Sequence, residues 1–195
     1  MIALLRTGLD AQVTVPMVLA ALRAHAPDVP GDEVERLAAV LTPYLASVPD
    51  ALDQIFATAR DPRCTRAVTF AAGTVLAYLF DEEDLLPEAR LGLLGLLDDA
   101  YLVHTFADEL SRTYPFAGPS AEAAGVSGGA AASHVVARLL PEGVADALLR
   151  TGRSTLQVAQ ALFPSGPVDG AALDLPEPNL RVQEAATSLE GLGSG

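Results

Sequence analysis

The chain has 195 residues and a formal net charge of −13, and half of its residues are hydrophobic while 19% are charged. This apolar content excludes a largely disordered protein, and the acidic excess argues against binding to the phosphate backbone of nucleic acids. The single cysteine, Cys64, excludes an intramolecular disulfide and a cysteine-rich zinc site. All twelve cationic residues are arginine, which is typical of proteins from GC-rich bacterial genomes.

The first third of the chain predicts three helices, at about 14–26, 32–43 and 49–60, because apolar residues recur there at helical spacing. Thr14 is a suitable N-cap for the first of them, since its side-chain oxygen can accept a bond from a free backbone N–H. Pro43 is expected to end or kink the second helix, because proline has no N–H to donate within a helix.

Residues 66–80 predict a fourth helix, which is apolar on nearly every side. A helix of this kind is usually central in a bundle or else faces lipid. Its longest uncharged run, residues 67–80, is shorter than the roughly 20 residues that cross a bilayer. We therefore expect residues 66–80 to form the centre of a helical bundle.

The remainder of the chain predicts further helices separated by irregular segments. Gly92 and Gly95 make the segment before residue 97 a poor regular helix, and residues 113–129 are expected to form a loop. Three more helices are expected, at about 130–140, 142–151 and 154–163.

These elements predict an all-α fold, a bundle of seven or eight helices that forms a single domain over residues 1–164. After this domain the composition shifts to Pro, Gly, Asp and Glu, so residues 165–195 are expected to form a flexible acidic tail. The start of the chain lacks the long apolar region of a secretion signal. This absence favours a cytoplasmic protein.

Four short motifs occur in order over residues 59–103. They are Ala-Arg-Asp-Pro-Arg at 59–63, Tyr-Leu at 78–79, Asp-Leu-Leu-Pro-Glu at 84–88 and Gly-Leu-Leu-Asp-Asp at 95–99. Together these motifs resemble the YkvA-like domain of unknown function, in which the third motif forms a bend and the fourth starts a helix. The resemblance departs from the family at Asp81-Glu82, where the family has Ser-Pro, and at Glu88, where it has Asp.

The resemblance implies a small helical bacterial protein, with the YkvA-like segment extending over about residues 49–112. Some members of that family are suspected of associating with membranes. The family has no established chemistry, so the resemblance implies no cofactor and no catalytic residue.

Asp98 and Asp99 stand at the start of a helix predicted over residues 97–112. At 100° per residue, Asp99 lies near the centre of the apolar side of this helix and Asp98 does not. We therefore expect Asp99 to point inward and Asp98 to lie nearer to solvent. A buried Asp99 needs the free N–H groups of the helix start and a cation, for which the candidates are Arg63, Arg66 and Arg90.

Two interpretations of the acidic cluster Asp84, Asp98, Asp99 and His104 are open. In the structural one, Asp84 and Asp98 cap helix starts and Asp99 forms a buried ion pair. In the functional one, the cluster serves a hydrolase or a metal-dependent enzyme, with His104 and Asp108 as further metal ligands. The structural interpretation is favoured, because capping requires only the local spacing that the sequence has.

Other patterns are less specific. Cys64 has no identifiable histidine partner and is expected to be a buried structural thiol, and Tyr78 is expected to be a core residue. Residues 147–162 have the spacing of a helix-turn-helix with Gly152 in the turn, but their second half lacks the cations that DNA binding needs. An ordinary helical hairpin is favoured, and no nucleic-acid partner is expected.

No nucleophile–base pair, cofactor fingerprint or metal cluster is recognisable, so the sequence predicts no catalytic residue, cofactor or metal ligand. It favours a non-catalytic helical interaction or scaffolding protein, whose protein partner docks in a groove between helices. The hydrolase or metal-dependent enzyme described above is one alternative. Peripheral membrane association through residues 66–97 is another, which the lack of a cationic amphipathic face there disfavours.

Overall fold

The computed structural model describes residues 13–79, 86, 91–115 and 129–163, and the regular elements within these ranges are all helical. They are α2 (Val15–His25), α3 (Gly31–Ala46), α4 (Val48–Arg60), α5 (Arg66–Tyr78), the 3-10 helix η1 (Gly92–Leu96), α7 (Leu97–Thr113), α8 (Gly129–Leu139) and α9 (Val144–Leu162). The predicted all-α class is confirmed for this part of the chain. The total of seven or eight helices stays a prediction, and the acidic tail at 165–195 lies outside the described residues.

The first helices follow their local signals closely. Thr14 stands at the N-cap of α2, although its side chain makes no capping hydrogen bond, and α4 ends at Arg60 as predicted. Pro43 lies inside α3, which continues to Ala46. Its carbonyl oxygen accepts a bond from the N–H of Ser47 at 3.1 Å, so one further turn closes after the proline. Because Pro43 lacks an N–H, it removes one hydrogen bond of the helix, but the other bonds remain. The helix therefore ends about one turn later than predicted.

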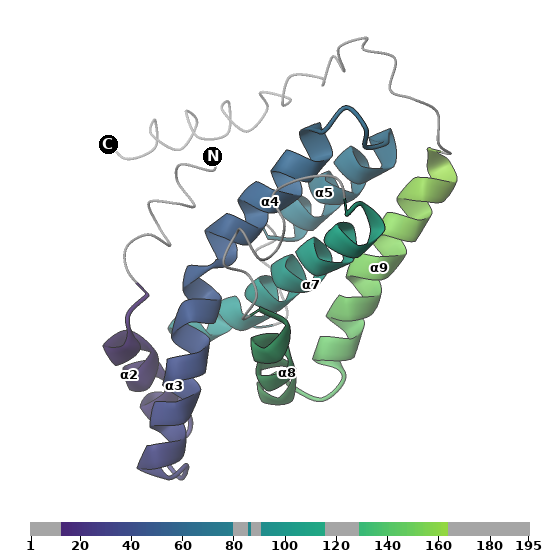
Figure 1. Cartoon of the computed structure of the whole chain (residues 1–195). Helices are drawn as coiled ribbons and strands as arrows, with labels where there is room; N and C mark the ends of the chain where they lie inside the picture. The colour runs from purple at the N-terminus through teal and green to yellow at the C-terminus, as the bar shows by residue number, and fades with distance from the viewer. Residues whose placement is uncertain (1–12, 80–85, 87–90, 116–128, 164–195) are drawn as a thin grey trace, which may run out of the picture.

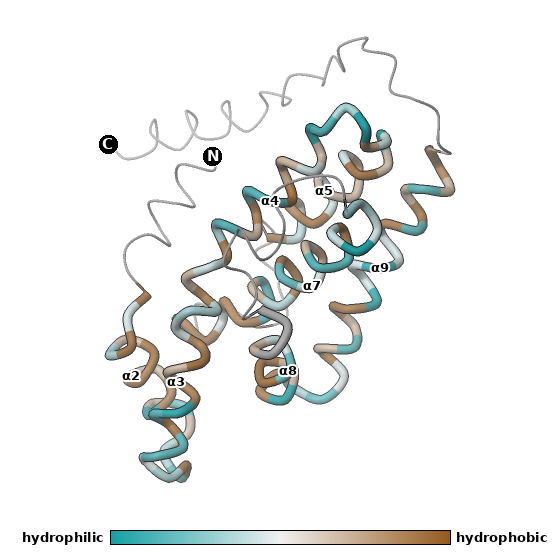
Figure 2. The backbone as a smooth tube through the Cα atoms, viewed as in Figure 1, coloured by the Kyte–Doolittle hydropathy of each residue, from teal (hydrophilic) through white to brown (hydrophobic). Residues whose placement is uncertain are grey.

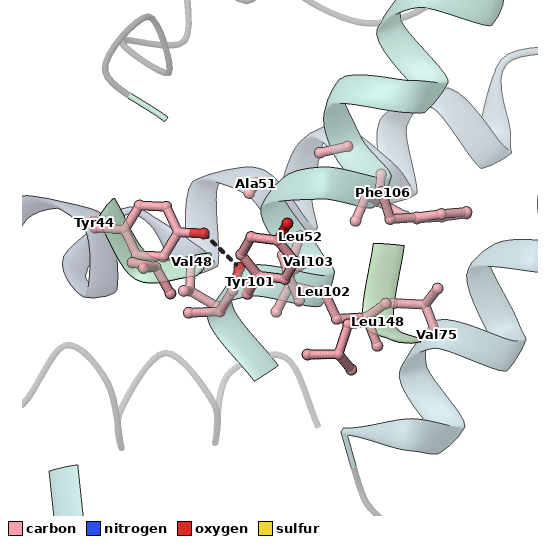
Figure 3. Packing of buried hydrophobic residues seen from close by; sticks show 14 of the residues in the cluster. Tyr44, Val48, Ala51, Leu52, Val75, Tyr101, Leu102, Val103, Phe106 and Leu148 are labelled. Carbon is pink, nitrogen blue, oxygen red and sulfur yellow. Dashed lines mark hydrogen bonds between the residues drawn. The ribbon is translucent and has the colours of Figure 1, made fainter. Parts of the chain in front are cut away.

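The central helix of the bundle is α7, which lies between α4 and α9 and also packs against α8 and η1 (Figure 1). More than half of its residues are buried, including Leu102, Val103 and Phe106, which are completely inaccessible to solvent. Figure 3 shows Leu102 and Phe106 among the aliphatic and aromatic side chains of this core. The starting half of α7 is surrounded by neighbouring helices on several sides.

The prediction that residues 66–80 form the central helix is wrong. α5 buries one face, with Ala67, Ala71 and Val75, against α4 and α9, while the side chain of Phe70 is 46% exposed. Its outer face also carries Arg66 and the small residues Gly73, Thr74 and Ala77. Small apolar residues tolerate water at little cost, so a high average hydrophobicity does not by itself place a helix at the centre. Figure 2 shows hydrophilic and hydrophobic residues interspersed along α4, α7 and α9.

A single helix, α9, replaces the two helices predicted at 142–151 and 154–163. Gly152, predicted to lie in a turn, is buried in the middle of α9, and a Cβ atom built on it would lie 3.8 Å from both Leu102 Cδ1 and Phe106 Cδ2. The helical hairpin and the helix-turn-helix spacing are therefore both contradicted. The contact of α9 with α7 at this position holds the residue in the helix despite the low helix propensity of glycine.

Replacing Gly152 with alanine is expected to leave the protein as stable or to stabilise it by up to about 1 kcal/mol, because alanine favours a continuous helix and its methyl group makes ordinary contacts. The matched control is Gly143→Ala at the start of α9, where φ is +81° and a side chain is strained, so a loss of about 1 kcal/mol is expected. Urea denaturation of both variants measures the difference. A loss on Gly152→Ala as large as that on Gly143→Ala would contradict the continuous helix.

Candidate functional site

Asp98 is completely buried at the start of α7, where it connects three parts of the chain. Its Oδ2 accepts hydrogen bonds from the backbone N–H of Leu86 at 3.1 Å and from the hydroxyl of Tyr78 at 3.4 Å. Its Oδ1 accepts a bond from the backbone N–H of Asp99 at 3.0 Å. Asp98 thus joins the end of α5 and the segment that contains Leu86 to the start of α7.

This arrangement reverses the prediction for the two neighbouring aspartates. Asp98 is inside, and Asp99 is partly exposed. The prediction was wrong because it assumed a single apolar side on the helix. In the fold, the first half of α7 is enclosed on several sides, with Asp98, Tyr101 and His104 all buried. Arg63, one of the predicted partners of Asp99, pairs with Asp61 at 2.6 Å, and Arg90 lies outside the described residues.

Burial raises the pKa of the Asp98 carboxyl, and the hydrogen bonds from Asp99, Leu86 and Tyr78 oppose this shift only in part. A buried carboxylate with a raised pKa is typical of catalytic acids as well as of structural anchors. A catalytic acid has to reach a substrate, however, whereas Asp98 is inaccessible to solvent. Its oxygens accept bonds that hold the fold together, whereas the sequence predicted a cap nearer to solvent, and the start of α7 has no side-chain capping bond.

His104 belongs to a second polar cluster, at the junction of α3 and α4. It is 4% exposed, and its Nε2 lies 3.0 Å from the backbone oxygen of Tyr44 and 3.3 Å from Ser47 Oγ. The rings of Tyr44 and His104 are 4.3 Å apart between centroids. Tyr44 Oη bonds to the Ala100 oxygen and to Ser133 Oγ, and Figure 3 shows its hydroxyl directed toward the start of α7. The sequence predicts His104 only as a member of the acidic cluster, and it gives no sign of a role for Tyr44, Ser47 and Ser133 beside it.

The hydrogen bonds of His104 exclude its action as a base on Ser47 in this arrangement. The Tyr44 carbonyl can only accept a bond, so Nε2 carries the proton, and Ser47 Oγ donates its own hydrogen to the same carbonyl at 2.9 Å. Nδ1 is buried and has no hydrogen-bond partner among the described residues. Burial also lowers the pKa of His104, which favours the neutral ring. The cluster therefore lacks the third group that orients a catalytic histidine.

Among the members of the predicted cluster that the structure describes, Asp98 and His104 are not brought together. Asp98 and His104 are six residues apart on α7, or about 120° around the helix axis, and they bond to different neighbours. Asp108 is exposed and pairs with Arg112, away from the buried His104. Asp84 lies outside the described residues. No group of three potential metal ligands occurs among the residues that the structure describes.

Cys64 has the buried surroundings predicted for it, whereas Tyr78, predicted to be a core residue, packs against the edge of the core. Cys64 is 3% exposed, and burial raises the pKa of its thiol, which disfavours the reactive thiolate. Tyr78 is partly buried and donates its hydroxyl to Asp98. Neither residue is presented to a substrate in the described part of the chain.

Four large apolar side chains of α5 and of the end of α9 are exposed, and two of them are in contact. The rings of Phe70 and Phe163 are 5.6 Å apart between centroids, and the two side chains are 46% and 36% exposed. Val158 and Leu162, one turn apart on α9, are 54% and 61% exposed. We call Phe70, Val158, Leu162 and Phe163 the α5–α9 surface; sequence reasoning missed it, because these residues have the pattern of core positions.

The side of α9 that carries this surface is distinct from the side that contacts α7. Arg153 pairs with Glu109 of α7, and Gln160 bonds to the hydroxyl of Tyr114, the residue that follows α7. At 100° per residue, Val158 and Leu162 lie more than about 120° around the helix from those two residues. They therefore lie on a side of α9 that faces away from Glu109 and Tyr114.

The two sequence segments that contain the α5–α9 surface are richer in arginine than the chain as a whole, although Arg63 pairs with Asp61 and Arg153 pairs with Glu109 of α7. Residues 60–79 and 150–163 contain five arginines and one acidic residue, Asp61. Arg66 is exposed one turn before Phe70 on α5. The formal charge of these two segments is positive, whereas the formal charge of the whole chain is −13.

No protein-family model, curated protein or solved structure matches the chain. The fold and the local chemistry therefore define its class: the described part is an all-α helical bundle with two buried polar clusters and an exposed apolar surface. None of its described helices combines the length and the hydrophobicity needed to cross a bilayer.

Proposed function

We propose that this protein is a non-catalytic helical interaction protein that binds a segment of another protein at the α5–α9 surface. The observation that supports the proposal is the exposure of Phe70, Val158 and Leu162 beside Phe163. Large apolar side chains gathered on a surface are typical of a binding site, because burial on association removes them from water. Aromatic residues are also enriched among those that contribute most to binding.

The surroundings of this surface indicate the chemistry of the partner segment. The exposed arginines of this region favour acidic groups, and the apolar side chains favour an apolar face. An amphipathic helix with acidic flanks satisfies both requirements, since it presents apolar residues on one side and carboxylates at the edges. We propose a partner segment of this kind.

The two polar clusters support a non-catalytic function. Asp98 and His104 are both buried, and their hydrogen bonds connect helices of the bundle. A hydrolase or a metal-dependent enzyme would need these groups to meet in an accessible cleft, and they bond to different neighbours. The resemblance of residues 59–103 to the YkvA-like domain also stays a proposal. Its support is that Asp98 connects three of the quoted motifs, through Tyr78 and Leu86.

Photo-crosslinking in the cells that make the protein tests this function. A photoreactive amino acid at Val158 is expected to form an adduct with another protein, whereas the same group at Val15 of α2, which is 43% exposed, is expected to form none. Phe70→Ser is expected to reduce the Val158 adduct at least about fivefold, the loss of roughly 1 kcal/mol of binding energy. The crosslinked peptide should contain both apolar and acidic residues.

Three outcomes would contradict the proposal. They are the absence of an adduct with another protein, equal adducts from Val158 and Val15, and a crosslinked peptide without acidic residues. Binding of the purified chain to vesicles of anionic lipid, lost on Phe70→Ser, would instead identify the surface as a membrane site. The net charge of −13 opposes that binding, and for this reason we propose a cytoplasmic location.

A further inference from the structure

We infer that residues 164–195 of the same chain occupy the α5–α9 surface when no partner is bound. This inference rests on the proposed function, because it assigns a resting occupant to the same surface. A partner segment would then bind only by displacing residues 164–195. The interaction would be inhibited by the chain itself until a sufficiently strong competitor is present.

The connection along the chain favours this occupant. α9 ends at Leu162, and Phe163, which contacts Phe70, immediately precedes the segment. The 32 residues at 164–195 are therefore attached at the surface itself. A short flexible connection holds a segment at an effective concentration in the millimolar range, so even a weak intrinsic affinity is sufficient for substantial occupancy.

The charges of the two parts are complementary. Residues 164–195 contain five acidic residues and one arginine, whereas residues 60–79 and 150–163 contain five arginines and one acidic residue. The acidic residues of the segment are Asp169, Asp174, Glu177, Glu184 and Glu190. In a chain with a formal charge of −13, few other regions attract an acidic segment.

The segment also has apolar residues at a spacing that matches a helix laid on an apolar surface. Val182, Ala186 and Leu189 are four and three residues apart, so they would lie on one face of a helix. Glu184 would lie on the opposite side, toward solvent. Taken alone, the composition of residues 165–195 predicts a flexible tail, because the apolar surface at the end of α9 is not visible in the sequence.

Hydrogen exchange of the full-length chain, measured by mass spectrometry without any partner, tests the inference. Amides within residues 180–192 are expected to exchange at least about tenfold more slowly than in an isolated peptide of the same sequence, because a docked segment has to open before it exchanges. In Phe70→Ser/Leu162→Ser these amides should return to within about twofold of the peptide rate. Val15→Ser/Met17→Ser is the matched control, since both residues are about as exposed on α2, and it should leave the protection unchanged.

A second pair of substitutions tests the charges without changing the apolar residues. Arg60→Glu/Arg66→Glu is expected to lower the protection of residues 180–192 at least about threefold at low salt, and less at high salt, because ions screen exposed charges. Slow exchange of α7 amides in every variant verifies that the bundle is folded. If the α7 amides of Phe70→Ser/Leu162→Ser exchange rapidly, that variant is not folded. In that case the protection of residues 180–192 in Arg60→Glu/Arg66→Glu tests the inference.

Three results would overturn the inference. Exchange of residues 180–192 at the peptide rate would show that the segment is undocked, and protection that survives both pairs of substitutions would place it elsewhere. Protection that increases with protein concentration would show that a second copy supplies the segment. Because the experiment contains no partner, none of these results affects the crosslinking test of the proposed function.

Discussion

Replacing Phe106 with alanine is expected to lower the free energy of unfolding by about 4 kcal/mol, the largest effect that we expect from a single substitution in this protein. Phe106 lies in the middle of α7 and is completely buried, in contact with the side of α9 that carries Gly152. Removing its ring leaves a cavity between α7 and α9, and their backbones cannot close this cavity without losing other contacts.

The matched substitution is Phe70→Ala in α5, the helix that the sequence predicts to be central. Because Phe70 is 46% exposed, the expected loss is about 1 kcal/mol or less. Urea denaturation at neutral pH measures the free energy of unfolding of both variants, provided that the dependence on urea concentration has the same slope for both. Equal losses would show that α5 shares the centre of the bundle with α7.

Replacing Asp98 with alanine is expected to lower the free energy of unfolding by about 3 kcal/mol, because the N–H groups of Leu86 and Asp99 and the hydroxyl of Tyr78 lose their acceptor. Asp98→Asn keeps only one acceptor oxygen, and its NH2 group faces the N–H of either Leu86 or Asp99, so it is expected to cost about 2 kcal/mol at neutral pH, less than the alanine variant. Asp99→Ala is the neighbouring control, with an expected loss of about 1 kcal/mol. A larger loss from Asp99→Ala than from Asp98→Ala would contradict the observed orientation of these side chains.

The pH dependence provides an independent measurement at Asp98. Burial raises the folded-state pKa above the ordinary value, so the folded protein holds this proton more tightly than the unfolded chain. The stability from this group is therefore fully present below its unfolded pKa and is lost as the pH rises through its folded pKa. We expect the stability of the wild type, measured relative to Asp98→Asn, to decrease from about pH 4 toward neutral pH. Comparison with this variant separates Asp98 from His104, whose lowered pKa acts in the opposite direction. A constant difference between the two proteins would contradict this assignment.

Local signals in the sequence were sufficient for several features of the fold. The start of α2 after Thr14 and the end of α4 at Arg60 follow from prolines near these ends, and the irregular helix at Gly92 follows from glycine. Cys64 was correctly predicted to be buried. These features depend on residues that are neighbours along the chain, so the sequence by itself determined them, together with the all-α class of the described part.

The tertiary structure decided which helix is central and which side chains meet. Helical periodicity predicts one apolar face, but it does not say how many helices pack around that helix. The sequence therefore predicts that α7 has one apolar and one polar side, and it places Asp98 on the polar side, near solvent. A glycine at position 152 is compatible with a turn and also with a contact between two helices. Only its position against Phe106 in the fold shows which of the two it makes. The α5–α9 surface depends in the same way on long-range packing, because its exposed residues look like core residues until the neighbouring helices are in place.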